Sequence, residues 1–279
     1  MWLESLTGPI EFTLGGQVAD IDPHVLQAIF VLLIGGLGVK AALVPLHGWL
    51  PAAMVAPAPV SALLHAVAVV KAGVFGIVRI IYDVYGIALV HSLGVGLPLA
   101  VLASVTIIYA SLRALQQSDI KRRLAFSTVS QISYIALGAA LFGPFATIGG
   151  LVHIVHQGLM KITLFFCAGA LSKQLGIHRV EELDGAGRRM PWTMLAFSVG
   201  GLGMIGVPPL AGFVTKWYLG IGALQAGEPW VILVLAASSL LNAAYFLPLI
   251  YRAWFLPAPE DARDGVERDR WLVGPPVVT

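Results

Sequence analysis

Seven hydrophobic stretches constrain the fold of this chain more than any other feature. They cover residues 26–50, 60–82, 92–112, 127–142, 147–171, 192–222 and 230–251. Most are close to the ~20 apolar residues that a helix needs to cross the hydrocarbon core of a bilayer. Only 11% of the residues are charged, whereas a soluble domain carries about 25%. The sequence therefore predicts an all-α polytopic membrane protein with about seven transmembrane helices.

Four of these stretches contain a lysine, and none of the four contains Asp or Glu. The lysines are Lys40, Lys71, Lys161 and Lys216. An ammonium at the bilayer centre costs about 3 kcal/mol even on the insertion scale that penalises it least. Ionisable residues at this depth mark ion and proton pathways. The pattern therefore favours a protonatable route whose counter-charges come from outside these stretches.

Proline interrupts two of the longer stretches. Pro45 follows Lys40 in the first stretch, and Pro208 and Pro209 precede Lys216 in the sixth. Proline removes a helix hydrogen bond and clashes with the preceding turn. Broken helices survive at membrane depth only where protein or water satisfies the freed backbone groups, and in transporters they commonly mark ion sites. We therefore expect two broken helices, each with a lysine beside its break.

The basic residues outside the stretches predict the orientation. They form three clusters, and with seven spans all three fall on one side, which the positive-inside rule identifies as cytoplasmic. The segment 1–25 is then non-cytoplasmic, the transmembrane domain covers 26–251 and the tail 252–279 is cytoplasmic. Arg79 is expected to snorkel or to pair with Asp83. The clusters are Arg113, Lys121, Arg122 and Arg123; Lys173, Arg179, Arg188 and Arg189; and Arg252, Arg263, Arg268 and Arg270.

The fifth stretch has the most regular polar pattern. His153, Gln157 and Lys161 recur every four residues, which makes a stripe about 12 Å long on a helix, with His156 in the same arc. Imidazole exchanges protons near neutral pH, so the stripe predicts a proton relay in which water fills the gaps. The alternative is hydrogen bonding that holds helices together, which does not need Lys161. A metal site at the two histidines is disfavoured, because Cys167 is the only thiol and no carboxylate is near.

Two further stretches place polar residues at membrane depth. His65 lies about one turn after Ser61, so the two can share a helix face, and its depth favours a functional role. His47 is interpreted instead as a loop residue near the membrane interface. The fourth stretch is expected to turn a polar face toward water or a neighbouring helix, because it contains Ser127, Thr128, Ser130, Gln131 and Ser133.

The sequence lacks the motifs of an enzyme with its own redox centre. It has no glycine-rich phosphate loop, cysteine cluster, nucleophile elbow or haem-ligand spacing. We therefore expect no cofactor and no metal. A net charge of +2 is too small to favour nucleic acid as a partner.

Four motifs lie in order along the chain. They read KAALVPLHGWLPAAMVAPAPVSALLHA, DIKRRLAFSTVSQISY, HIVHQGLMKITLF and GVPPLAGFVTKWYL. In this order they resemble the proton-translocating antiporter-like subunits, which are the large membrane subunits of respiratory complex I and of Mrp-type sodium/proton antiporters. The resemblance covers about residues 26–251. The segments ALLHAVAVVKAG and EELDGAGRRMP look closest to the D-type subunits of Mrp antiporters.

The resemblance assigns family positions to the residues of the first two stretches. Lys40 matches the lysine on the family's broken seventh helix. His65 and Lys71 match the histidine and lysine that some members carry on the eighth helix.

The resemblance also covers the fifth and sixth stretches. His153 and Lys161 match residues of the family's central hydrophilic axis, and Lys216 matches the lysine or glutamate on the broken twelfth helix, usually taken as the exit-side residue. Many members have a second histidine where this chain has Gln157, so the neighbouring His156 is expected to compensate, or water to bridge the gap.

Members of the family resemble fourteen-helix proteins built from two inverted repeats of five helices. By this resemblance the chain starts at the seventh helix, and so contains the end of one repeat and the complete second. The family's glutamate on the fifth helix has no counterpart here. The resemblance thus implies a fragment, one half of a split gene or a truncated paralogue, with a partner chain or segment that supplies the missing N-terminal helices.

The implied function is movement of protons along buried Lys and His residues in a bacterial inner membrane. The chain would be one of several membrane subunits of an Mrp-type Na+/H+ antiporter or a complex I-like assembly, with H+ and, in an antiporter, Na+ as its ions. One alternative is a proton-pumping subunit of NADH-quinone oxidoreductase or a related hydrogenase, whose enzyme activity would belong to other subunits. The other is a truncated structural subunit that no longer transports.

Overall fold

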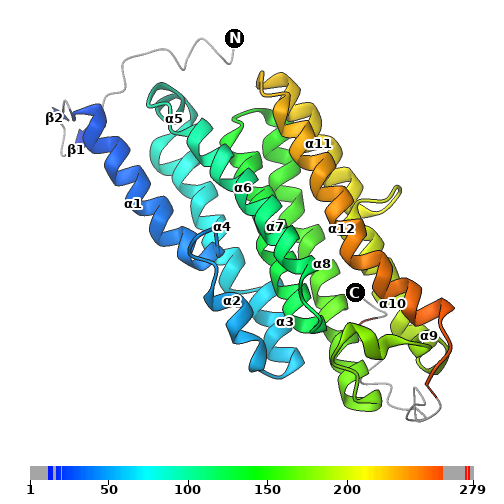
Figure 1. Cartoon of the computed structure of the whole chain (residues 1–279). Coiled ribbons are helices and arrows are strands. Elements are labelled where there is room, and N and C mark those ends of the chain that lie inside the picture. Colours follow the sequence, from blue (N-terminus) through cyan, green and yellow to red (C-terminus); the bar gives the residue numbers. More distant parts are fainter. Residues whose placement is uncertain (1–11, 15–16, 20, 260–273, 275, 277–279) are drawn as a thin grey trace.

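The computed structural model describes residues 12–14, 17–19, 21–259, 274 and 276, and in this part the chain forms a helical bundle (Figure 1). The N-terminal strands β1 (Phe12–Leu14) and β2 (Gln17–Ala19) pair antiparallel. The helices are α1 Pro23–Ala41, α2 Trp49–Ala52, α3 Ala58–Ala66, α4 Val69–Arg79, α5 Ile87–Ser92, α6 Gly96–Leu115, α7 Ile120–Ala140, α8 Pro144–Leu175, α9 Ala186–Arg189, α10 Pro191–Ile205, α11 Ala211–Gln225 and α12 Trp230–Phe255.

Five segments in the described part are long and apolar enough to cross a membrane by themselves. They are Pro23–Ala41, Ala58–Tyr85, Gly96–Leu115, Pro144–Leu175 and Trp230–Phe255. The fourth and sixth predicted spans correspond to α7, which carries a basic first turn, and to the pair of short helices α10 and α11. All seven predicted stretches are therefore helical, and the prediction of an all-α polytopic membrane protein is confirmed.

Helix α7 is the central helix of the bundle, between α6 and α8 (Figure 1). It begins at Ile120, seven residues before the predicted span, because the side chain of Asp119 accepts a hydrogen bond from the backbone N–H of Arg122 and caps the basic first turn. Every residue from 123 to 141 is buried. The polar side chains of the fourth stretch thus face other helices and not lipid, which is one of the two arrangements expected.

Both predicted helix breaks are present. Helix α1 ends at Ala41, Ala42 adopts a left-handed conformation with φ of 56°, and Pro45 lies in the loop that follows. Helix α10 ends at Ile205, where the left-handed Gly206 turns the chain through residues 207–210 into α11. Each break leaves the last carbonyl groups of a helix without intrahelical partners.

A third break was not predicted. The second hydrophobic stretch is divided between α3 and α4 at Val67 and Ala68, and it ends in a π-helical turn, Ile80–Tyr85. No proline or glycine lies at this break. At the end of α4, Arg79 pairs with Asp83 at 2.6 Å, as expected from their spacing.

The basic clusters lie together at one end of the bundle. Ile120 donates its backbone N–H to the carbonyl of His178 at 3.0 Å, and Arg252 pairs with Asp184 at 2.8 Å. These contacts join the α6–α7 loop, the α8–α10 connection and the end of α12, as the predicted topology requires. Arg263, Arg268 and Arg270 lie outside the described residues.

Candidate functional site

A layer of buried polar side chains runs through the middle of the bundle. It is formed by stripes on α7, α8 and α12 and by the start of α11. Its members include Ser127, Gln131, Tyr134, His153, Gln157, Lys161, Thr215, Ser238, Asn242 and Tyr245, each at most 1% exposed. Burying so many polar groups in apolar surroundings is unfavourable unless they find partners.

Lys161 is the most deeply buried of the four lysines and is 0% exposed. It extends from α8 toward α7, where it donates hydrogen bonds to the carbonyl of Leu124 at 3.0 Å and to the hydroxyl of Ser127 at 2.6 Å. Among the described residues the salt bridges involve only Arg79 and Arg252, so Lys161 is held by neutral acceptors. The two acceptors that hold its ammonium are both uncharged.

His65 lies close to Lys161 at the C-terminal end of α3. The two interact electrostatically, and the His65 ring packs against Phe165 with 4.8 Å between ring centroids. His65 is fully buried together with Ser61, which confirms that the two share a face, and neither of its ring nitrogens has a protein partner among the described residues. Such a histidine is placed to bind internal water.

Lys71 occupies the first turn of α4, directly after the unpredicted break. Its ammonium donates to the backbone carbonyl of Ile154 on α8. The approach depends on Gly158, because a Cβ atom at that position would collide with the Lys71 Nζ and would lie 3.3 Å from the carbonyl oxygen of Ala66. The break between α3 and α4 thus places the Lys71 ammonium in contact with α8, the helix that carries the predicted relay.

Two histidines on α8 share one partner on α11. The Nδ1 atoms of His153 and His156 lie 3.2 and 3.3 Å from the hydroxyl oxygen of Thr215. A hydroxyl has a single proton to donate, so it can donate to only one imidazole at a time. His153 Nε2 and both amide atoms of Gln157 have no protein partner although they are buried. These orphaned atoms mark places for water between His153 and Lys161.

Lys216 lies at the second helix break. It donates to the carbonyl of Ile205, the last residue of α10, at 2.6 Å and to the hydroxyl of Ser239 on α12 at 2.7 Å. Its Nζ is 5.8 Å from the centroid of the Tyr134 ring. A cation at a helix C-terminus is stabilised by the carbonyl dipoles there.

Lys40 is separate from the rest of the candidate site. It is exposed near the end of α1, and within the described part of the chain its ammonium has no hydrogen-bond partner. The same helix exposes Val31 and Leu32 by 63% and 75%. Its backbone and Cβ lie against Gly73 of α4, and the exposed part is the rest of the side chain with the ammonium.

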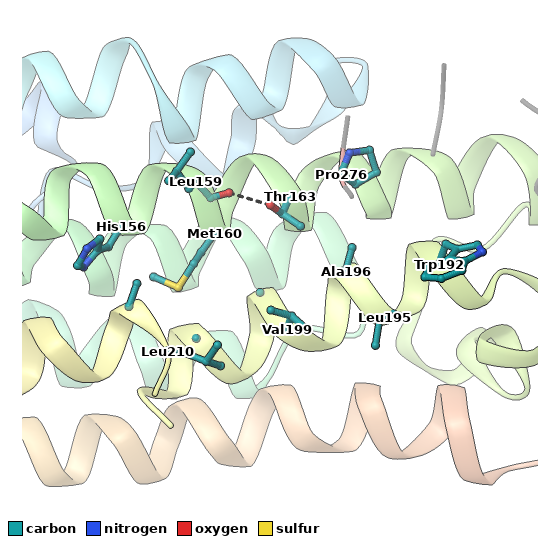
Figure 2. Close-up of a pocket in the computed structure, with 13 residues that line it drawn as sticks. His156, Leu159, Met160, Thr163, Trp192, Leu195, Ala196, Val199, Leu210 and Pro276 are labelled. Atoms are coloured by element: carbon teal, nitrogen blue, oxygen red, sulfur yellow. Dashed lines mark hydrogen bonds between the residues drawn. The ribbon is translucent and has the colours of Figure 1, made fainter. Parts of the chain in front are cut away.

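An apolar cavity of about 450 Å³ lies between α8 and α10. Figure 2 shows His156 at one end of it, Met160 and Leu210 along it, and Trp192 at the other end. Pro276 of the C-terminal tail also contributes to its lining. His156 is the only titratable group in the described lining. The cavity therefore adjoins the proposed relay at His156 and contacts none of the four lysines.

Several residues of the site were not predicted from the sequence. Thr215, Tyr134 and Ser239 contact the predicted residues but carry no pattern of their own. The sequence offers only their positions as clues. Thr215 directly precedes Lys216, and Tyr134 is the last residue of the polar run in the fourth stretch. Ser127 was recognised as polar, but its bond to Lys161 was not.

Comparison with known proteins places this geometry in a family. The sequence profile described as "NADH:quinone oxidoreductase/Mrp antiporter, TM" matches residues 1–242. NADH-quinone oxidoreductase subunit N of Desulforudis audaxviator is 41% identical over 241 residues, which cover 86% of this chain and 48% of that protein. Hydrogenase-4 component B of Escherichia coli is 33% identical over 281 residues, which cover 91% of this chain and 40% of that protein.

The solved structures agree with the sequence comparison. A chain in the structure of the Mrp complex from Dietzia sp. superposes with a TM-score of 0.79 at 28% identity, covering 91% of this chain and 55% of the other. The chain thus spans about half the length of the relatives that it matches. It belongs to the NADH:quinone oxidoreductase/Mrp antiporter transmembrane family.

Proposed function

We propose that this chain conducts protons as a membrane subunit of an Mrp-type Na+/H+ antiporter or a complex I-like assembly. The observation that carries the proposal is Lys161, which is fully buried on a spanning helix and held only by a carbonyl and a hydroxyl. Placing an ammonium at this depth in the membrane is energetically unfavourable, and an apolar side chain could fill the same space without that cost. The family description names an oxidoreductase and an antiporter, and the names of the relatives include an oxidoreductase subunit and a hydrogenase component, which supports the same class of function.

The proposed route begins at the exposed Lys40 and then follows the other three lysines through the buried polar layer. Lys40 and Lys71 accept and store protons, Lys161 passes them along with the histidines of α8, and Lys216 releases or receives them at the second break. A carbonyl accepts a hydrogen bond from either form of lysine, and a hydroxyl accepts from the ammonium but can donate to the neutral amine. Such surroundings accommodate both charge states. Repulsion between charged neighbours in a low dielectric then couples one site to the next.

His65, His153 and His156 complete the route. His65 adjoins Lys161, and His153 interacts electrostatically with both Lys71 and Lys216. Gln157 lies between His153 and Lys161, where it orients water and cannot itself take a proton. Alternation of the Thr215 hydroxyl between the two α8 histidines supplies a switch at the end of the relay.

The proposal includes a partner that covers Lys40. A chain or segment with the N-terminal helices of the family would pack against α1 and supply a carboxylate. The joined basic clusters would face the cytoplasm of a bacterial cell, with the N-terminal segment on the other side of the inner membrane. Other membrane subunits of the assembly would contact the remaining lipid-exposed faces.

Two other functions are distinguishable. A proton-pumping subunit of an NADH-quinone oxidoreductase or hydrogenase would show proton movement only with a redox substrate, whereas an Mrp-type subunit would respond to a sodium gradient. A truncated structural subunit would support assembly of the complex but no proton movement through this chain. The buried lysines disfavour the last alternative, because a subunit that only supports assembly does not need them.

The experiment measures proton movement with a pH-sensitive dye in membrane vesicles that contain the assembled complex. Lys161→Met keeps the length of the side chain and removes its charge, so we expect transport to be lost. Lys173→Met is the matched control, because Lys173 is exposed on the same helix. Transport at the wild-type rate by Lys161→Met, with equal assembly, would refute the relay.

A further inference from the structure

Helix α12 carries a buried polar stripe that the route proposed above does not use. Ser238, Asn242 and Tyr245 recur at i, i+4 and i+7 and therefore line one helix face over about 10 Å. All three side chains are 0% exposed. Most other residues of the helix are apolar, and Leu233 and Leu240 are exposed by 72% and 73%, so the stripe faces the interior of the bundle.

Helix α7 carries a matching stripe with the same spacing. Ser127, Gln131 and Tyr134 are at i, i+4 and i+7 and are at most 1% exposed. The two stripes meet at both ends. The Tyr134 hydroxyl donates to Ser238 at 2.7 Å, and at the other end the Tyr245 hydroxyl lies near the Ser127 side chain and interacts with it.

Each end of this double stripe reaches a lysine of the proposed route. Lys161 donates to Ser127 at 2.6 Å. Lys216 donates to Ser239, the residue next to Ser238, at 2.7 Å. The two stripes therefore bring polar groups from Lys161 to the helix turn beside Lys216 without using Gln157 or the histidines of α8. Water has to bridge Ser238 and Ser239, because adjacent side chains of a helix do not face each other.

The middle of the double stripe has unpaired groups that call for water. The Tyr245 hydroxyl donates to the amide oxygen of Asn242, but the amide nitrogens of Asn242 and Gln131 are buried without a protein partner. Unpaired amides at the centre of a membrane helix bundle are costly unless water occupies the space beside them.

We propose that the α7–α12 stripe is a second proton-conducting branch, parallel to the α8 stripe, between Lys161 and Lys216. The inference rests on the proposed function, because a branch has meaning only if protons move through the chain. Its central element is Tyr245, which connects Ser127 at Lys161 to the water-binding amide of Asn242.

The transfer along this branch leaves every protein group between the two lysines as it began. The Lys161 ammonium gives a proton to the Ser127 oxygen while Ser127 gives its own proton to the Tyr245 oxygen, and Tyr245 releases its proton to water beside Asn242. The water passes a proton to Ser238, which gives its own hydroxyl proton to a second water. That water passes a proton to Ser239, and Ser239 gives its own hydroxyl proton to the neutral amine of Lys216. Lys161 ends neutral and Lys216 ends charged. The amide orients the water and exchanges no proton itself.

Double substitution distinguishes two parallel branches from a single path. Tyr245→Phe removes the hydroxyl of the α12 branch and keeps the ring, and Gln157→Leu interrupts the α8 stripe. With two branches, we expect each single variant to lower the initial rate by about two- to fivefold and the double variant to abolish transport, a non-additive result. Rates are measured in vesicles with a pH-sensitive dye and are divided by the amount of assembled complex.

The controls separate conduction from folding. Tyr251→Phe makes the same chemical change at a side chain of α12 that is 56% exposed, so wild-type transport is expected. Ser238→Ala interrupts the branch by a smaller change, and it should reproduce Tyr245→Phe in the wild-type and Gln157→Leu backgrounds.

Two results would overturn the branch while leaving the proposed function intact. One is wild-type transport by Tyr245→Phe and Ser238→Ala in a wild-type background together with no added effect in Gln157→Leu. The other is a double variant no slower than the slower single variant, which is the signature of one path. Absence of proton movement in the wild-type complex would instead overturn the proposed function, and the branch with it.

Discussion

The buried lysines share one kind of surrounding at the residue scale. Lys71, Lys161 and Lys216 each donate to a backbone carbonyl, and the last two also donate to a serine hydroxyl. A carboxylate would favour the charged lysine strongly, whereas neutral acceptors fix the position of Nζ with less preference for one charge state. This surrounding therefore suits a residue that must gain and lose a proton.

The first prediction concerns the hydroxyl shared by the two α8 histidines. Thr215→Val keeps the shape of the side chain and leaves buried His153 Nδ1 without its partner, which should lower the free energy of unfolding by about 1–3 kcal/mol. We also expect slower transport, because both imidazoles then lose the hydroxyl that they share. Thr215→Ser retains the hydroxyl and should behave like wild type. Thermal unfolding in detergent and dye-based transport measure the two effects, and equal behaviour of the valine and serine variants would contradict the assigned role.

At the scale of helices, proline allowed two of the three breaks to be predicted. Pro45 and Pro208 cannot continue a helix, so their effect is local and is visible in the sequence. The break at Val67 and Ala68 involves residues that a helix accepts, and therefore depends on packing between distant helices. The same holds for the site. Spacing on one helix predicted the α8 stripe, but no local pattern shows that Thr215 or Ser239 lies beside it.

The second prediction concerns the contact between the halves of the broken helix. At Gly212 a Cβ atom would collide with the carbonyl oxygen of Gly203, so α11 can approach α10 only with glycine there. Gly212→Ala should destabilise the protein by about 1–3 kcal/mol through overpacking. It should also slow transport, because Lys216 is held by the end of α10.

The matched control lies on the same helix. Gly220 has no atom within 4 Å of the position that a Cβ would take. Gly220→Ala should leave thermal unfolding unchanged or raise the Tm slightly, since alanine favours helix more than glycine does. If both alanine variants lower the Tm equally, the tight contact is not the cause.

The third prediction concerns the short 3₁₀ helix Val180–Leu183 at the basic end of the bundle. The Glu182 carboxylate accepts hydrogen bonds from the backbone N–H groups of His178 and Arg179 at 2.7 and 3.0 Å, and these bonds lower its pKa from the usual 4.5. A carboxyl whose pKa is lowered by folding stabilises the protein above its unfolded pKa, and the effect is lost as pH falls through the folded value.

Glu182→Gln should therefore lower the Tm at pH 7, and the difference from wild type should shrink as pH falls below about 4.5. Glu181→Gln is the control, because in the described structure the Glu181 side chain has no comparable pair of backbone donors. If the difference in Tm between wild type and Glu182→Gln stays constant down to pH 3, the charge of Glu182 does not contribute to stability.

At the scale of the whole molecule, the bundle has two different edges. Helices α1 and α12 lie at opposite edges in Figure 1, and both expose apolar side chains. The α1 edge also exposes Lys40, and an ammonium facing the hydrocarbon is unfavourable. Sequence reasoning predicted the role of Lys40 and the need for a counter-charge, but the surroundings of Lys40 depend on residues outside the described part of this chain.

The last prediction follows from this asymmetry. A benzophenone amino acid placed at Leu32, 75% exposed on α1, should form a photo-adduct with a polypeptide in the assembled complex. Mass spectrometry should identify that polypeptide as membrane helices that include an Asp or Glu, because a carboxylate beside Lys40 would stabilise its exposed ammonium. The same probe at Leu240, 73% exposed on α12, gives the background of lipid and neighbouring subunits. Adducts of Leu32 with lipid alone would contradict the partner, and they would leave Lys40 in contact with the hydrocarbon, a placement that costs about 3 kcal/mol and that snorkelling would have to relieve.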